Sequence, residues 1–366
     1  MAARERILII KPSSLGDIIH TLPLAHALKR CQPQCFIGWV VEQAFSSLLK
    51  ADPSIDAIYP IHIPSTSDPD TGKSAYLAAL RATVTTLRQL RRSFRDYPYG
   101  RVLDLQASFR SGLLALMNPG GRRTGFADAR ELNTLFQHER IPVPAEITHA
   151  LDKNLLFAAH LGCDVRPEDF FLSTSAEAEK EVDAFLLAAG FHSGGRLVYV
   201  QPAARWQSKH WLTERWGELV DRLATRGLQC VFGGSAADLP LLRQIGAAMH
   251  HKPLVAAGQL SLLAGAALLK RSALYVGVDT GPMHMAALAG RPVVALFGPT
   301  HPERVGPYNT TGRVLQVAGL DCLCCRRRSC SHQSCMQGIS VEMVEQAVLE
   351  LFAQEKKFVT GMNGLG

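Results

Sequence analysis

Residues 272–308 constrain the fold of this chain more than any other stretch of its sequence. Two apolar runs, 273–278 and 293–297, are typical of buried parallel strands. Between them, residues 283–289 are predicted to form a short helix, with Pro282 in its first turn, where a missing N–H costs nothing. The stretch therefore predicts a β-turn-α-β unit, which belongs to an α/β fold.

The turn of this unit, which contains Asp279, Thr280 and Gly281, is a candidate binding site for a phosphate. The N-terminus of the following helix presents free backbone N–H groups and a positive dipole end, which favour an anion. Glycine at position 281 lets the anion approach the backbone, and His284 lies around the same turn. An ordinary strand-to-helix turn with a capping threonine also fits these residues. The loop 298–302 favours the binding site, because it leaves the next strand at the sheet edge where ligands bind.

The start of the chain shows a first strand-turn-helix pattern. Residues 6–11 are predicted to form a strand, 12–16 a turn and 17–30 a helix. Asp17 is either a carboxylate that stabilises the helix dipole or a catalytic group. The turn contains only Gly16, whereas a dinucleotide fingerprint needs three glycines, so a simple NAD-binding start is disfavoured.

The alternation of strands and helices begins again in the second half of the chain. A strand is predicted at 197–201, a loop at 202–209 and a helix at 210–226. Two successive α/β halves imply two Rossmann-like domains, with ligand sites at the carboxyl ends of their strands. We place these domains at 1–175 and 176–340.

The composition describes a globular, basic protein. Hydrophobic residues make up 47 % and charged residues 19 % of the 366 residues, which disfavours a disordered chain. The net charge of +7 suits an anionic partner, which could be a nucleic acid, a membrane surface or a phosphorylated glycolipid. The sequence has no zinc-finger, homeodomain or RNA-recognition signature, so nucleic acid is the least favoured. No apolar run reaches the roughly 18 residues of a membrane span, and no signal peptide is recognised, so we expect a cytoplasmic protein with mostly reduced thiols.

Two stretches of the first half leave alternatives open. Residues 76–94 are predicted to form an arginine-rich helix, whose charges are either solvated or face the phosphates of an acceptor lipid or anionic headgroups. The polar loop 64–73 contains a D-x-D pattern, Asp68 and Asp70, which could suggest a metal-dependent sugar-nucleotide site. We discount that site, because proline among turn residues marks a solvated loop.

The tail of the chain contains a cysteine-rich segment, D-C-L-C-C-R-R-R-S-C-S-H-Q-S-C-M. Cys322 and Cys325 have the C-x-x-C spacing of a zinc knuckle, whereas Cys330 and Cys335 are spaced too widely for the usual pattern. A structural zinc site and a compact loop of reduced, buried cysteines both fit. The arginines at 326–328 either touch an anionic lipid or are solvated.

Two motifs at opposite ends of the chain indicate a family. D-T-G-P-M-H-M-A-A-L-A-G-R-P-V-V-A-L-F-G-P-T, beginning at Asp279, resembles the C-terminal motif of the family 9 glycosyltransferases, the ADP-heptose:lipopolysaccharide heptosyltransferases. K-P-S-S-L-G-D-I-I-H-T-L-P, at 11–23, resembles the N-terminal motif of that family. The resemblance implies a GT-B architecture, in which two Rossmann-like domains face each other across a cleft. In that architecture the last helix, here about 341–357, often packs back on the first domain.

The resemblance also implies roles for individual residues. Asp17 matches the catalytic Asp of the family, and Lys209 matches its phosphate-binding Lys. The expected donor-binding residues are Lys209, Asp279, Thr280, Gly281, His284 and, by a loose alignment, Asp238. The expected acceptor-binding residues are Lys11, Ser14, Arg88, Arg91, Arg92, Arg122, Arg123 and Arg130.

Glycosyl transfer from a nucleotide diphosphate sugar makes three chemical demands. It needs a base for the acceptor hydroxyl, cations or N–H groups for the departing diphosphate, and a dry cleft. Asp17 is the only carboxylate of the N-terminal motif, so it is the candidate base. Lys209 and the helix N-terminus at Thr280 would serve the diphosphate in place of a metal. We therefore expect an inverting, metal-independent glycosyltransferase that needs no cofactor.

The expected substrates are ADP-heptose and the Kdo or inner-core region of lipopolysaccharide, a lipid A-type glycolipid. The W-V-V-E-Q-A-F stretch at 39–45 resembles the heptosyltransferase I branch, which transfers to Kdo. We expect a peripheral protein on the inner face of the inner membrane, with an anionic membrane surface and no nucleic acid among its partners. The alternatives are a sugar-nucleotide-binding or isomerising protein of the same plan, or a family 9 transferase with another donor or acceptor.

Overall fold

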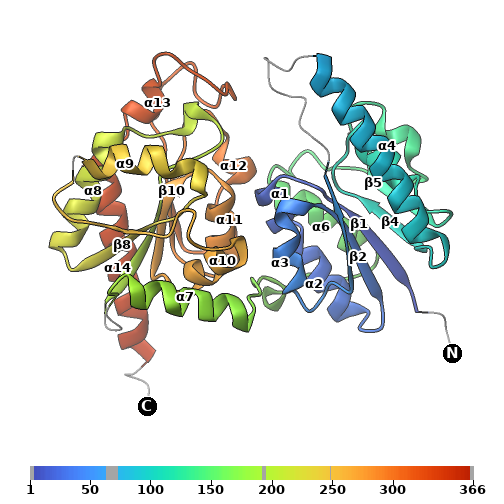
Figure 1. Cartoon of the computed structure of the whole chain (residues 1–366), viewed down its shortest axis with the longest axis horizontal. Coiled ribbons are helices and arrows are strands. Elements are labelled where there is room, and N and C mark those ends of the chain that lie inside the picture. Colours follow the sequence, from blue (N-terminus) through green and yellow to red (C-terminus); the bar gives the residue numbers. More distant parts are fainter. Residues whose placement is uncertain (1–3, 63–72, 192–194, 248, 363–366) are drawn as a thin grey trace. The chain divides into compact units, whose positions relative to one another are not determined.

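The computed structural model describes residues 4–62, 73–191, 195–247 and 249–362. The chain divides into two compact units, Met1–Ser173 and Thr174–Gly366, so the boundary lies two residues before the expected one. In the described part of the chain, each unit contains one parallel sheet of six strands with helices packed around it (Figure 1). The D-x-D pattern at Asp68 and Asp70 lies outside the described residues.

The sheet of the first unit has the strand order β3-β2-β1-β4-β5-β6. Its strands are β1 (Arg6–Ile10), β2 (Phe36–Glu42), β3 (Ala57–Ile61), β4 (Arg101–Asp104), β5 (Arg122–Phe126) and β6 (Glu139–Ile141). Its helices are α1 (Leu15–Ile19), α2 (Leu22–Cys31), α3 (Ser46–Lys50), α4 (Lys73–Arg95), α5 (Phe109–Ala115) and α6 (Ala150–His160). The winding reverses between β1 and β4, and this switch point is where sheets of this type bind ligands.

The sheet of the second unit has the order β12-β11-β10-β7-β8-β9, which repeats the winding of the first. Its strands are β7 (Arg196–Gln201), β8 (Leu228–Phe232), β9 (Leu254–Val255), β10 (Leu274–Val278), β11 (Val293–Leu296) and β12 (Gly312–Leu315). Its helices are α7 (Ala176–Ala188), α8 (Thr213–Thr225), α9 (Leu239–Ala247), α10 (Leu262–Arg271), α11 (Gly281–Leu288), α12 (Pro302–Val305), α13 (Ser334–Gln337) and α14 (Val341–Met362). Its switch point lies between β7 and β10.

The central strands are apolar on both faces. In β1 the side chains from Ile7 to Ile10 are fully buried, and every residue of β10 is buried. Such strands need helices on both sides of the sheet. In the second unit, α8, α9 and α14 contribute to one core. Because the winding reverses at the switch point, right-handed crossovers place α11 on the opposite face.

The first helical segment differs from the prediction of one helix at 17–30. α1 ends at Ile19, and α2 begins at Leu22. Pro23 lies in the first turn of α2, and it has no N–H with which to continue a helix from α1. Between the two helices, the hydroxyl of Thr21 donates to the carbonyl of Asp17 over 2.8 Å. Asp17 is therefore carried by one short helical turn.

Several elements are absent from the sequence prediction, among them β5, β6, β9, β12 and α7. β5 begins with two arginines, and β12 is an edge strand that is only partly buried. Polar or half-exposed strands of this length lack the apolar run by which the central strands are recognised. The prediction therefore finds the middle of each sheet better than its margins.

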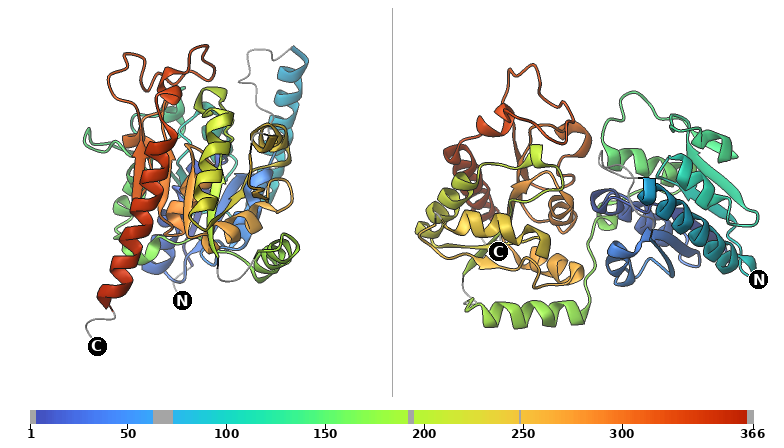
Figure 2. Two further views of the ribbon diagram at one scale, coloured as in Figure 1. Left: turned by 90° about the vertical axis from the view of Figure 1, so that its left-hand side faces the viewer. Right: turned by 45° about the horizontal axis from the view of Figure 1, so that its top comes forward.

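The last helix belongs to the core of the second unit. Val341, Val344, Val348 and Leu351 of α14 belong to the core of the second unit, where the helix contacts α8, β11 and β12. Figure 2 shows α14, in red, running along that unit. The apolar stripe of the helix is thus buried within the second unit. The expected packing of this helix on the first domain stays a prediction.

The cysteines are mostly free thiols, as expected, with one pair excepted. Cys31 at the end of α2 and Cys163 after α6 form a disulfide within the first unit. The other seven cysteines are free.

Candidate functional site

In the first unit the candidate site lies at the carboxyl end of β1, at the switch point. Ser14 caps α1, and its backbone N–H and hydroxyl donate to Oδ2 of Asp17 over 2.9 and 2.7 Å. These two hydrogen bonds hold the carboxylate in one orientation. The Asp17 side chain is still 43 % exposed. The local sequence thus produces a carboxylate that is fixed by the protein and accessible to a substrate.

Lys11 directly follows β1, and its side chain is largely buried. Its side chain is only 8 % exposed, and its Nζ lies 3.5 Å from Oδ1 of Asp17. The ammonium also donates to the carbonyl of Leu105, just after β4, over 3.0 Å. Lys11 therefore links the carboxyl ends of β1 and β4, and its charge acts directly on Asp17.

These neighbours determine the pKa of Asp17. Burial raises the pKa, but the charge of Lys11, the hydrogen bonds from Ser14 and the charge of His20 together outweigh it. The pKa of Asp17 consequently lies below its ordinary value. The carboxylate is ionised at neutral pH, as a proton acceptor must be.

Two histidines near this carboxylate escaped the sequence prediction. His20 follows α1 and is 4 % exposed, and its ring centroid lies 5.3 Å from that of His149. His149 caps α6, where its Nδ1 accepts the N–H of Leu151 over 3.1 Å. The sequence offers one signal for His20, which stands one helical turn after Asp17.

The carboxyl end of β4 holds a second carboxylate that the prediction did not select. Asp104 is fully buried, and its Oδ2 accepts from Ser111, Asn133 and Gln137 over 3.0, 2.7 and 3.1 Å. Burial raises the pKa of Asp104, against the lowering effect of these hydrogen bonds. This network fixes the start of the loop after β4. The first carbonyl of that loop, that of Leu105, accepts from Lys11.

The expected acceptor-binding arginines do not form one cluster. Arg122 and Arg123 begin β5, and the register pairs Arg122 with the first residue of β4. They therefore lie at the amino edge of the sheet, opposite the edge that carries Asp17. Arg122 pairs with Glu139 over 2.6 Å, and the side chain of Arg123 donates to the Phe136 carbonyl. The structure does not bring these two arginines together with Asp17.

The remaining expected arginines occupy other positions. Arg130 follows β5, at the same carboxyl edge of the sheet as Asp17, and it is exposed. Arg88, Arg91 and Arg92 are exposed on α4, whose other face packs into the core of the first unit. The basic helix is thus an outer surface of this unit.

In the second unit an ion pair lies at the other switch point. Nζ of Lys209 lies 2.7 Å from Oδ2 of Asp279 and donates to the Asp279 carbonyl over 3.1 Å. Lys209 ends the short 3-10 helix Gln207–Lys209, in the loop after β7, and Asp279 directly follows β10. Their side chains are 15 % and 5 % exposed. An ammonium has three N–H groups, so this one can still donate to a ligand.

The first turn of α11 lies next to this pair. Thr280 is the N-cap, Gly281 is the first helical residue, and a proline occupies the first turn, as predicted. His284 is 7 % exposed, with Nε2 3.8 Å from Oδ1 of Asp279. The N–H groups at the start of α11 therefore point toward the edge at which Lys209 lies.

Asp238 lies at the carboxyl end of β8, in the 3-10 helix Ala236–Asp238. Its Oδ2 accepts from the N–H and the hydroxyl of Ser235 over 2.7 and 2.9 Å. The carboxylate caps its own turn in this way. Its expected contact with the donor ribose stays a prediction.

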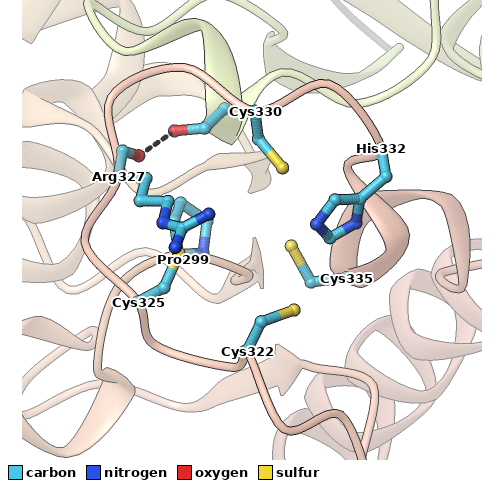
Figure 3. A pocket seen from close by; sticks show the side chains of 8 residues that line it. Pro299, Cys322, Cys325, Arg327, Cys330, His332 and Cys335 are labelled. Carbon is cyan, nitrogen blue, oxygen red and sulfur yellow. Dashed lines mark hydrogen bonds between the residues drawn. The ribbon is translucent and has the colours of Figure 1, made fainter.

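The cysteine-rich segment surrounds one pocket (Figure 3). Four cysteines and a histidine line it: Cys322, Cys325, Cys330, Cys335 and His332. Cys324 does not line it, and its thiol donates to the carbonyl of Thr300 over 3.3 Å. Within the described ranges, no three His, Cys, Asp or Glu side chains are arranged to hold a metal ion. The structural zinc site stays a prediction.

Comparison with known proteins identifies the family of this chain. A family model described as glycosyltransferase family 9 (heptosyltransferase) matches residues 87–336, more than half of the chain. The chain belongs to glycosyltransferase family 9. The family inferred from the two terminal motifs is thereby confirmed.

Named relatives resemble this family 9 chain over most of its length. Lipopolysaccharide heptosyltransferase 1 of Pseudomonas aeruginosa is 30 % identical over 337 residues, which cover 90 % of this chain and 88 % of that protein. The structure of a family 9 glycosyltransferase from Veillonella parvula has a TM-score of 0.81 at 23 % identity, covering 97 % of this chain and 99 % of that one. Escherichia coli heptosyltransferase WaaC with ADP has a TM-score of 0.70 at 23 % identity, covering 94 % and 99 %. The predicted α/β fold of GT-B type, with two Rossmann-like units, is confirmed.

Proposed function

We propose that this family 9 enzyme transfers heptose from ADP-heptose to the Kdo or inner-core region of lipopolysaccharide, with inversion at the anomeric carbon. The relative from Pseudomonas aeruginosa is named for heptose transfer to lipopolysaccharide. The WaaC structures contain ADP and ADP-2-deoxy-2-fluoro heptose. The observation that carries the proposal is the accessible carboxylate of Asp17, with its lowered pKa, at a switch point.

Asp17 is the general base of the proposed reaction. The acceptor hydroxyl gives its proton to the carboxylate, and its oxygen forms a bond to the anomeric carbon of the heptose. Ser14 donates hydrogen bonds to Oδ2 of Asp17, and the ammonium of Lys11 lies near its Oδ1. These contacts orient the carboxylate toward one side and keep it ionised. A single displacement by the acceptor inverts the anomeric configuration.

The second unit serves the leaving group. As the bond between the anomeric carbon and the β-phosphate oxygen breaks, the electron pair remains on ADP. Lys209 has an N–H to donate to that phosphate, and the first turn of α11 supplies backbone N–H groups. We propose that these groups neutralise the diphosphate without a divalent metal.

The exposed face of α4 suits a lipid-linked acceptor at a membrane surface. Arg88, Arg91 and Arg92 are exposed there, and Tyr76 and Leu80 are exposed in the N-terminal part of the helix, at 55 % and 60 %. Basic side chains attract anionic headgroups, and aromatic and apolar side chains enter the interface. In the part of the chain that the structure describes, no helix is long and apolar enough to cross a membrane. We propose peripheral binding to the cytoplasmic face of the inner membrane.

Mass spectrometry of a de-heptosylated lipid acceptor, incubated with enzyme and candidate nucleotide sugars, tests the proposed function. We expect the mass of one heptose to be added with ADP-heptose, and the Asp17→Asn variant is the matched control. Nuclear magnetic resonance of the product then reports the anomeric configuration. A donor that is hydrolysed or epimerised without a lipid product supports the sugar-nucleotide alternative instead.

A further inference from the structure

The arginine run at 326–328 is part of a strap that joins two loops of the second unit. At one end, the N–H groups of Cys324 and Arg326 donate to the carbonyls of Gly298 and Pro299, over 3.1 and 2.7 Å. At the other end, the N–H of Ser208 donates to the carbonyl of Arg328 over 3.1 Å, and its hydroxyl donates to the carbonyl of Arg327 over 2.6 Å. The strap thus connects the loop after β11 to the loop after β7.

The position of the strap follows from the strand order. β10 lies between β11 and β7 in the sheet. A segment bonded to the loops after both neighbours therefore runs past the carboxyl end of β10. Asp279 stands at that end, and its carboxylate pairs with Lys209. The strap consequently brings its arginines to the candidate donor site.

Two arginines of the strap, Arg327 and Arg328, have different surroundings. Arg327 lines the cysteine pocket, as Figure 3 shows. The guanidinium of Arg328 lies 5.8 Å from the ring centroid of Trp206, and Nζ of Lys209 lies 4.9 Å from the same centroid. Both distances are in the range of a cation–π contact. Arg328 and Lys209 thus share one indole, although they lie far apart in the sequence.

The anion expected at this edge favours more than one cation. Lys209 is paired with Asp279 over 2.7 Å, so the carboxylate offsets part of the charge that this ammonium offers. A nucleoside diphosphate carries more than one negative charge, so a second cation beside Lys209 and the helix N–H groups would strengthen its binding. We propose that Arg328 is a second cation for the donor diphosphate, held beside Lys209 by the strap and by Trp206. This inference rests on the proposed function, because it takes an ADP-linked donor as the ligand of the second unit.

Titration calorimetry with ADP and with adenosine tests this role. Arg328→Gln removes the charge, and Arg326→Gln, two residues away, is the matched control with the same charge change. We expect ADP to bind Arg328→Gln about tenfold more weakly than the wild-type protein, as the loss of a charge-assisted contact predicts. We expect adenosine affinity to be unchanged in both variants, and Arg328→Lys to restore part of the affinity for ADP.

The outcomes separate this inference from the proposed function. If the wild-type protein binds ADP, and Arg328→Gln binds it as tightly as Arg326→Gln does, Arg328 is not a diphosphate ligand. An equal loss of ADP and adenosine affinity would also overturn the inference, because it would indicate a disturbed loop. If the wild-type protein does not bind ADP, the donor assignment itself fails, and the inference fails with it.

Discussion

Nζ of Lys11 lies 3.5 Å from Oδ1 of Asp17, and the same ammonium donates to the carbonyl just after β4. The second unit contains a related arrangement, in which Lys209 donates to the carboxylate and the carbonyl of Asp279, just after β10. In both units a lysine from the loop after the first strand reaches across the switch point. Each lysine thereby places a positive charge where the proposed reaction uses a carboxylate or a phosphate.

The first prediction concerns the base. Asp17→Asn keeps the size of the side chain and removes its basicity. We expect turnover to fall by about a hundredfold or more, as is usual when a general base is lost. Affinity for ADP, measured by calorimetry, should stay close to that of the wild-type protein. Near-normal turnover in this variant would remove Asp17 from the role.

The second prediction concerns pH. Lys11 lowers the pKa of Asp17 while burial raises it, so Lys11→Met should shift this pKa upward. Asp17 accepts a proton only when ionised, and the acid limb of the rate profile should therefore move to higher pH. The dependence of kcat/KM on pH for the acceptor measures the shift. Lys153→Met, which breaks an ion pair with Asp128, is a control that should leave the limb in place.

The third prediction separates donor binding from stability at the second switch point. Lys209→Met should weaken ADP binding by tenfold or more, roughly the value of a charge-assisted contact. It should also destabilise the protein by about 3 kcal/mol, because the buried carboxylate of Asp279 loses its ammonium partner. Adding Asp279→Asn should recover much of the stability, measured by urea unfolding, without restoring ADP affinity. Recovery of both would mean that Lys209 only stabilises the loop.

The fourth prediction concerns metals. Because Lys209 and the start of α11 are placed to serve the diphosphate, EDTA should leave the transfer rate intact. Loss of activity that returns with Mg²⁺ or Mn²⁺ would bring the D-x-D pattern back into consideration. A zinc effect on thermal stability without an effect on rate would implicate the cysteine pocket. In that case Cys325→Ser should abolish the zinc effect, while Cys324→Ser should retain it, since Cys325 lines the pocket and Cys324 does not.

The fifth prediction concerns the membrane. Each basic group near an anionic surface contributes about 1 kcal/mol, and salt screens the attraction. We expect binding to anionic vesicles that weakens as salt rises, and that weakens when Arg88, Arg91 and Arg92 become Ser. The KM for the lipid acceptor should rise more than the KM for the donor.

A triple variant with the same charge change is the control for the basic helix. It replaces three exposed arginines of other surfaces by Ser, namely Arg166, Arg226 and Arg243. Vesicle binding that does not change with salt concentration would show that the arginines of α4 serve another purpose. A rise in the KM for the donor as large as the rise in the KM for the acceptor would show the same.

Much of the fold was accessible from the sequence because its signals are local. The apolar runs of β1 and β10, and the Thr280-Gly281 turn with its following proline, each depend on a few adjacent residues. Asp17 was selected in the same way, as the carboxylate of a short motif. The errors were local too, since Pro23 divides the helix predicted at 17–30, and the polar β5 was missed. Missing β5 hid the fact that Arg122 and Arg123 stand at the amino edge of the sheet.

By itself, then, the sequence determined two α/β units, a carboxylate just after the first strand and a candidate phosphate-binding turn near the end of the chain. Only the tertiary structure decided which groups meet there. Lys11 contacts Leu105 across 94 residues, Lys209 contacts Asp279 across 70, and Ser208 contacts Arg327 across 119. A hydrogen bond or ion pair needs atoms within about 3–4 Å of each other. That distance depends on which strands are neighbours in the sheet, and residue spacing along the chain does not specify it.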